Sequence, residues 1–164
     1  MIRLDLNPAA AEPEWVELPA YTSGKGEDRV VPALHCAQPT LAALRAAQAS
    51  ARHCVPGRDE GEAEDAYVER LKATLAAYGA SLPEGRLNLS ARVEGAISAV
   101  ATTALAEALI VGWRGFGARG GGDEEEIEPD ETAIRAAMRD VYIAGVFDAW
   151  VKDKLSGRLS EGNG

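Results

Sequence analysis

The histidines and cysteines are the first residues whose types and spacing could do chemistry. They occur as two adjacent pairs, His35 with Cys36 and His53 with Cys54. Four such side chains could hold a zinc ion if they converged in a tetrahedron. Neighbouring side chains on a strand or helix point apart, however, and the usual spacer of two to four residues within each pair is missing. We therefore predict no metal site here.

A glycine-rich stretch between Gly115 and Gly122 could suggest a phosphate-binding loop. A Walker loop ends in Gly-Lys-Ser/Thr, and a dinucleotide-binding loop follows a strand. These glycines instead follow a predicted helix and precede Asp123–Glu131, where seven of nine residues are acidic and would repel phosphate. That acidic run lacks the ligand pattern and central glycine of an EF-hand, and no Gly-x-Ser-x-Gly nucleophile motif is present. The sequence favours a protein that is not an enzyme and uses no cofactor.

Apolar side chains beside this break are better candidates, for binding another protein. Trp113 and Phe116 lie where an apolar helix is predicted to end, and Phe147 and Trp150 lie on the last helix. Such rings either anchor a partner or pack on the protein's own core, and both interpretations stay open. The candidate partner-binding residues are Ala108, Val111, Trp113, Phe116, Phe147 and Trp150.

The composition indicates helices with a core of small residues. Of 164 residues, 31 are alanine, which has the highest helix propensity but contributes little burial. The formal net charge is −9, with no clustered basic face. Nucleic acid and anionic membrane are therefore not expected as partners.

The chain is expected to act in the cytoplasm. Two cysteines are too few for a disulfide framework, and residues 1–7 lack the pattern of a signal peptide.

Between Gly95 and Trp113 the one charged residue is Glu107, so a membrane span must be weighed. The stretch is rich in Ala, Gly, Thr and Ser rather than Leu and Ile, and a carboxylate is costly in hydrocarbon. We predict a buried central helix instead.

The elements that must position these residues divide the chain into four segments. Residues 1–38 form an N-terminal β-hairpin region, with short strands near 15–18 and 29–34. Residues 39–113 form a helical core, with predicted helices at 40–53, 64–78 and 90–112. Residues 114–131 form a Gly-rich, acidic linker. Residues 132–164 form a C-terminal helical segment and tail, in which Gly145 is a candidate break. The predicted fold class is mainly α (α+β), a hairpin followed by a helical bundle.

Three stretches carry a family resemblance. The first is Trp15–Pro19, then Arg29–Leu34, then Pro39–Thr40 opening an Ala/Arg helix. The second is Leu109–Phe116, a helix end with a Trp-x-Gly turn before an acidic loop. The third is the ending Glu161–Gly164 after the last helix. In this order and spacing they resemble the tail assembly chaperones of long-tailed bacteriophages and related gene transfer agents. Residues 55–89 take no part in the resemblance.

The resemblance implies a chaperone that coats the tape-measure protein, keeps it soluble and recruits tail-tube subunits before leaving the assembling tail. It implies action in the host bacterial cytoplasm and absence from the mature virion, and it leaves room for a homo-oligomer. We expect the tape-measure segment to lie in an apolar groove along the central helix, ending at Trp113. The alternative is a structural head-tail adaptor, which would remain in purified particles.

Overall fold

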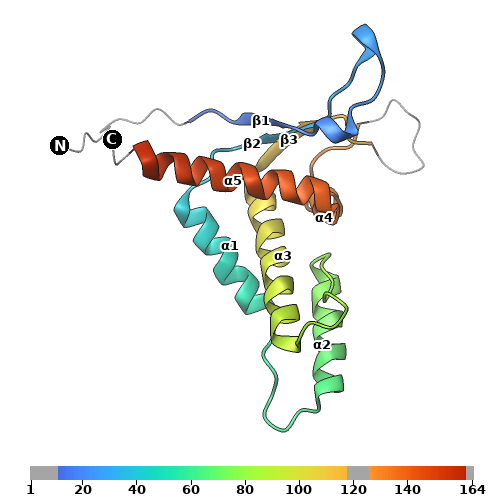
Figure 1. Ribbon diagram of the computed structural model, residues 1–164, viewed down its shortest axis with the longest axis vertical. Coiled ribbons are helices and arrows are strands. Elements are labelled where there is room, and N and C mark those ends of the chain that lie inside the picture. Colours follow the sequence, from blue (N-terminus) through green and yellow to red (C-terminus); the bar gives the residue numbers. More distant parts are fainter. Residues whose placement is uncertain (1–10, 118–125, 162–164) are drawn as a thin grey trace, which may run out of the picture.

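In residues 11–117 and 126–161, which this computed structural model describes, three strands and five α-helices form the fold. The sheet lies at one end of the molecule, the last helix crosses beneath it, and the first three helices extend toward the opposite end (Figure 1). The fold is mainly α with an N-terminal β-hairpin, as predicted. The elements are β1 (Glu14–Glu17), β2 (Ala33–Cys36), α1 (Leu41–Cys54), α2 (Glu64–Ala77), α3 (Leu89–Leu109), β3 (Ile110–Arg114), α4 (Glu131–Met138) and α5 (Val141–Glu161).

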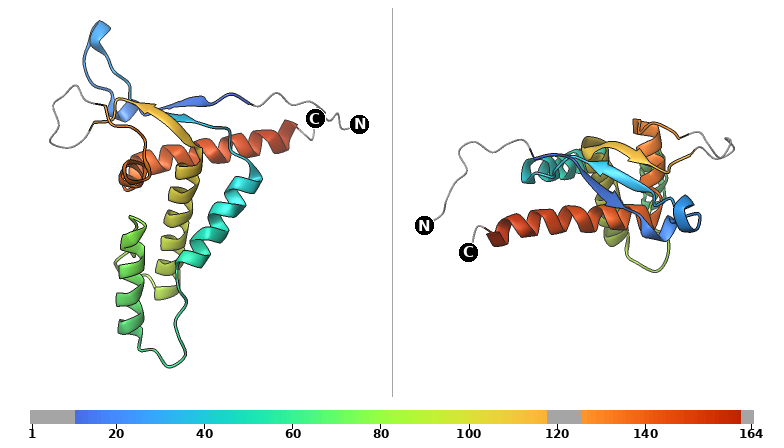
Figure 2. Two further views of the ribbon diagram at one scale, coloured as in Figure 1. Left: turned by 180° about the vertical axis from the view of Figure 1, so that it is seen from behind. Right: turned by 90° about the horizontal axis from the view of Figure 1, so that it is seen from above.

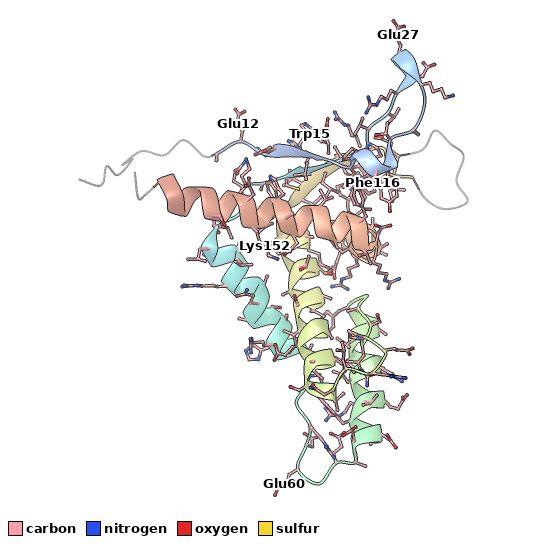
Figure 3. All side chains as sticks on the ribbon, in the orientation of Figure 1. Glu12, Trp15, Glu27, Glu60, Phe116 and Lys152 are labelled. Atoms are coloured by element: carbon pink, nitrogen blue, oxygen red, sulfur yellow. The ribbon has the colours of Figure 1, made fainter. Side chains whose placement is uncertain are left out.

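The sheet is antiparallel in the order β1-β2-β3. Val16 pairs with Leu34, and Leu34 pairs with Trp113. These three side chains are buried in the core that the sheet shares with the helices. The next register positions, Trp15 and His35, lie on the other face and stack with ring centroids 4.4 Å apart (Trp15 is labelled in Figure 3). The sheet thus covers one end of the helical core.

Helix ends follow the capping chemistry of the sequence. The side chains of Thr40, Asn88 and Asp130 each accept a hydrogen bond of 2.7 to 3.0 Å from the backbone N–H three residues on. These bonds satisfy N–H groups that have no partner inside the helix. Gly79 follows the end of α2 with a φ of 69°, the left-handed conformation that favours glycine. The predicted starts and ends of the first two helices are confirmed to within about two residues.

Three predicted boundaries are wrong. The second strand of the hairpin is Ala33–Cys36, not residues 29–34, because Pro32 has no N–H with which to extend the ladder. The central helix ends at Leu109, not near Gly112, because residues from Ile110 onward form β3 and complete the sheet. The β-branched pair at 110–111 suits a strand, and Trp113 gains a place in the core. The C-terminal helices part at Asp140, not at Gly145, because the Asp140 carboxylate accepts hydrogen bonds from the backbone N–H groups of residues 142 and 143.

The two ends of the predicted linker are ordered by pairing. Ile127 N–H donates to the Phe116 carbonyl over 3.0 Å, and Gly117 forms a bridge with Glu126. The middle of the linker, residues 118–125, lies outside the described residues, as do residues 162–164 of the predicted tail. Within the described residues, no helix is long and apolar enough to cross a membrane.

The core divides into two clusters that meet along α3. The larger one joins the inner face of the sheet to α4, α5 and the C-terminal part of α3. The smaller one joins α2 and the end of α1 to the N-terminal part of α3, through Tyr67, Leu71 and Leu75. Figure 2 shows the corresponding arrangement: α5 crosses α3 near the sheet, whereas α2 lies beside the half of α3 that is farther from the sheet.

Candidate functional site

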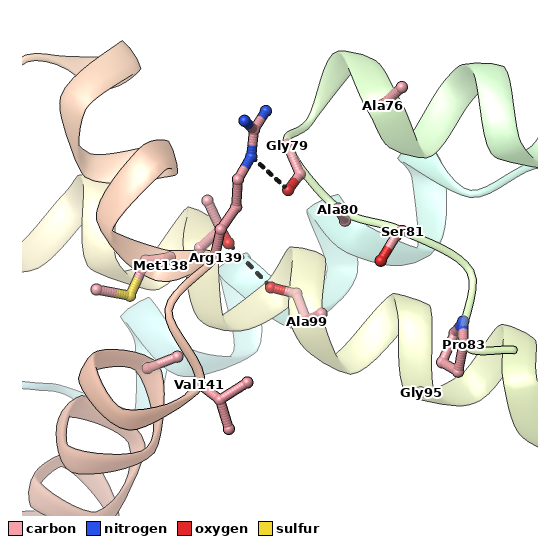
Figure 4. A pocket seen from close by; sticks show the side chains of 12 residues that line it. Ala76, Gly79, Ala80, Ser81, Pro83, Gly95, Ala99, Met138, Arg139 and Val141 are labelled. Atoms are coloured by element: carbon pink, nitrogen blue, oxygen red, sulfur yellow. Dashed lines mark hydrogen bonds between the residues drawn. The ribbon is translucent and has the colours of Figure 1, made fainter. Parts of the chain in front are cut away.

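A groove lies between the two core clusters. Its floor is the middle of α3, one wall is the end of α2 with the loop that follows, and the other wall is the corner between α4 and α5 (Figure 4). The largest hollow in it has a volume of about 700 Å³. That volume lies within the range of small-molecule and peptide-side-chain pockets.

The floor is flat because its residues are small. Gly95, Ser98, Ala99, Thr102 and Thr103 follow one another at steps of three, one, three and one along α3, which places them on a single face. The Thr103 hydroxyl donates to the Ala99 carbonyl over 3.1 Å, so it is satisfied within the helix. The floor therefore offers a mostly apolar surface that a second backbone can approach closely.

The first wall depends on Gly79 and Arg139. The Arg139 Nε donates to the Gly79 carbonyl over 3.1 Å, which joins the end of α2 to the end of α4. A Cβ on Gly79 would lie 3.2 Å from this same Nε. Gly79 therefore provides both the left-handed turn and the room for the arginine.

The second wall is held by a carboxylate and an arginine outside the groove. The Tyr21 hydroxyl donates to Asp140 over 2.6 Å, and this hydrogen bond, with those from two backbone N–H groups, lowers the pKa of Asp140. The Arg135 Nε donates to Glu107 over 2.6 Å and so fixes α4 to α3; this partner raises the pKa of Arg135. Both contacts keep the α4–α5 corner in place.

Two smaller hollows continue the groove under α5. One, of about 330 Å³, includes Gly145 and shares Gly95 and Ala99 with the largest hollow. The other, of about 200 Å³, reaches Leu44 and Gln48 on α1. The three adjoin through shared lining residues, so the groove runs from the end of α2 across α3 to α1.

The edge of the groove is apolar and carries few charges. Val141, at the start of α5, is 88% exposed, and it lines the largest hollow. Arg139 is the one charged residue among those that line this hollow. Under α5, Asp148 pairs with Lys152, so these two charges cancel locally. The net local charge is positive in a protein whose total is −9.

Most of the predicted partner-binding aromatic rings are in the protein's own core. Trp113 is 8% exposed, stacks on Phe116 at 4.5 Å between centroids, and donates its indole N–H to the Ile127 carbonyl. Phe147 is completely buried at the base of the small hollow beside α1. Trp150 is partly buried and packs near Phe147. Trp113 and Phe147 therefore present no free ring to a partner in this structure.

The other two predicted residues lie outside the groove. Ala108 is on an exposed part of α3, and Val111, in β3, is 55% exposed. The groove crosses the middle of the central helix rather than following the helix to Trp113. The residues that the prediction missed had a signal: small side chains at 95, 98, 99 and 102 repeat at helical spacing.

The histidine and cysteine pairs do not converge. Cys36 is buried in the larger cluster, where loss of hydration raises the pKa of its thiol to about 12. His35 stacks on Trp15 on the far face of the sheet, whereas His53 and Cys54 end α1. Among the described residues, no group of three or more His, Cys, Asp or Glu side chains could hold a metal ion.

The arrangement of the groove is suited to packing rather than to proton transfer or metal binding. Its floor and walls offer van der Waals surface to a narrow apolar segment. No protein-family model, no curated protein and no solved structure matches the chain.

Proposed function

We propose that the protein is a tail assembly chaperone of the long-tailed phage and gene transfer agent type. In this role it binds apolar helices of the tape-measure protein, keeps them in solution, recruits tail-tube subunits and catalyses no reaction. The proposal combines the resemblance of Trp15–Pro19, Leu109–Phe116 and the chain ending with one structural observation. That observation is the open groove over the small residues of α3, which the protein's own side chains leave unfilled.

The groove suits a helix of another chain for a physical reason. Amphipathic helices bind grooves by inserting apolar side chains one or two turns apart. Each inserted Leu or Val side chain that leaves water contributes about 1.5–3 kcal/mol. Two or three such side chains contribute about 3–9 kcal/mol, which is set against the lost freedom of the two chains and the ordering of the segment, so the binding is reversible. The acidic remainder of the surface opposes self-association of the loaded complex.

Co-expression tests the proposal. The full chain is produced together with the tape-measure protein of the same phage or gene transfer agent, and the soluble fraction of the tape-measure protein is measured. We expect it to be soluble with the chain and insoluble without it. Equal solubility in both cultures would contradict the proposal.

A matched pair of variants locates the binding surface. Ala99→Leu fills the floor of the groove, whereas Ala66→Leu places the same side chain on an exposed part of α2, ten residues before Ala76, which lines the groove. Ala99→Leu should reduce co-purification of the tape-measure protein, and Ala66→Leu should not. Mass spectrometry of purified particles separates the chaperone from a head-tail adaptor, because finding the chain there in stoichiometric amounts would favour the adaptor.

A further inference from the structure

We propose that the groove selects a helix that carries two features. One is an acidic side chain beside the apolar stripe of the helix, which pairs with Arg139. The other is a large aliphatic residue that enters the recess, which is the hollow under α5 lined by Gly95 and Gly145. This inference rests on the proposed function in taking the groove as the binding site. It adds the chemistry of the bound helix and the groove residues that contact each of its two features.

Two helical glycines mark the recess. Gly95 in α3 and Gly145 in α5 both line the hollow under α5. A Cβ on Gly145 would meet no atom within 4 Å, and one on Gly95 would make only ordinary contact, 3.5 Å from the Pro83 ring. Neither has a positive φ. Glycine inside a helix is unfavourable relative to alanine, and packing within this chain does not require it at either place.

An occupant gives both glycines a role. Without side chains at these positions, two helix backbones border a hollow wide enough for a branched aliphatic side chain. The exposed Val141, one turn before Gly145 on α5, lines the adjoining hollow and offers further apolar surface to the incoming helix. The recess therefore favours a large apolar residue on the incoming helix over alanine.

Charge sets the second requirement. Arg139 uses its Nε for the Gly79 carbonyl, and no ion pair joins it to a carboxylate among the side chains that the structure describes. Arg135, one turn earlier on α4, is instead paired with both Glu107 and Glu131. Arg139 thus keeps guanidinium N–H groups available at the edge of the groove, where a carboxylate of the occupant would be bound.

The local charge and the total charge make opposite predictions. The chain carries −9, so its long-range field favours a basic peptide. Arg139, in contact with the occupant, favours an acidic one. A preference for acidic peptides would therefore report the groove and not the general field.

Three synthetic peptides test the inference. Each has 20 residues, with leucines at helical spacing on an Ala/Gln background, and they differ by a single Glu, Gln or Lys beside the leucine stripe. Binding to the full chain is measured by fluorescence anisotropy. We expect the Glu peptide to bind about two- to five-fold more tightly than the Lys peptide, the range of a partly exposed ion pair.

Matched variants assign the effect to residues. Arg139→Gln should remove the preference for Glu, whereas Arg45→Gln, an exposed arginine on α1, should leave it unchanged. Gly145→Leu should weaken all three peptides at least ten-fold, and Gly157→Leu, farther along α5, should not. Circular dichroism of each variant confirms that it is folded. A tighter Lys peptide, or an unchanged Glu preference in Arg139→Gln, would overturn the inference.

The remaining outcomes separate this inference from the proposed function. If the peptides behave as expected but the tape-measure protein stays insoluble, the chaperone role fails and the groove chemistry stands. If the tape-measure protein is solubilised equally by the Arg139 and Gly145 variants, the groove chemistry fails and the chaperone role stands. A stable dimer in light scattering that Gly145→Leu dissociates would assign the groove to a second copy and overturn the inference.

Discussion

Replacing Gly145 with alanine should stabilise the free protein. Gly145 lies inside α5, and a Cβ built on it would meet no atom within 4 Å. Glycine in a helix interior costs about 0.5–1 kcal/mol relative to alanine, because it loses more backbone freedom on folding. The added methyl group would clash with no atom of the groove, so nothing reduces the stability gained by removing the glycine. The free energy of unfolding should therefore rise by about 0.5–1 kcal/mol.

Urea and thermal unfolding followed by circular dichroism measure this change. For a chain of this size each kcal/mol corresponds to about 2–4 °C, so Tm should rise by about 1–4 °C. Gly79→Ala makes the same chemical change but should lower the free energy of unfolding. Its φ of 69° disfavours any side chain by about 1–2 kcal/mol, and its Cβ would lie 3.2 Å from the Arg139 Nε.

A loss of stability in Gly145→Ala would refute the reasoning. It would mean that this face of α5 is covered in solution, so that the added methyl group meets an obstacle. Gly157→Ala is the control, because a Cβ there also meets nothing within 4 Å, outside the groove. If Gly157→Ala stabilises and Gly145→Ala destabilises, the groove is not open in the free protein and both proposals lose their structural basis.

Three further predictions concern the framework around the groove. Phe147→Ala should lower the free energy of unfolding by about 3–5 kcal/mol in urea titrations, because it empties a completely buried site. A loss below about 1 kcal/mol would mean that the larger core cluster is loosely packed. Asp140→Asn should weaken the acid dependence of stability. The hydrogen bond from Tyr21 lowers the pKa of Asp140, so the contribution of Asp140 to stability is present above the unfolded carboxyl pKa and is lost as pH falls through the folded value. If the variant and the unchanged protein lost stability equally between about pH 5 and about pH 2, this prediction would be contradicted. In the native protein a thiol reagent should label Cys54 well before Cys36, whose burial raises its pKa to about 12; equal rates, measured by mass spectrometry, would show that the core opens.

The sequence was sufficient for elements with a clear local signal. The helix start at Thr40 and the turn at Gly79 follow from chemistry within four residues, whereas the cap at Asn88 starts α3 ahead of the predicted residue 90. The hairpin also follows from short alternating runs around a glycine-containing loop. Each of these depends on the chain near it, which is why the mainly α fold with a hairpin could be predicted.

The strand at 110–114 required information that no local pattern holds. Its residues continue an apolar helix in composition, and they form a strand because Leu34 offers a partner some eighty positions earlier. The same pairing moves Trp113 from a predicted binding surface into the core. The burial of Trp113 has a tertiary reason, since one additional strand decides which side of the helix end is buried.

In the groove, the features that favour binding of a partner helix lower the stability of the free protein. Val141 is 88% exposed, and Gly145 lies inside a helix, where glycine is unfavourable relative to alanine. An incoming helix would bury the first and fill the space left by the second. Stability and binding should therefore diverge at one position: Gly145→Ala raises Tm, whereas Gly145→Leu keeps the fold and weakens peptide binding. If a leucine at 145 left peptide binding intact, the recess would be an accident of packing between two core clusters rather than the place where a partner helix is held.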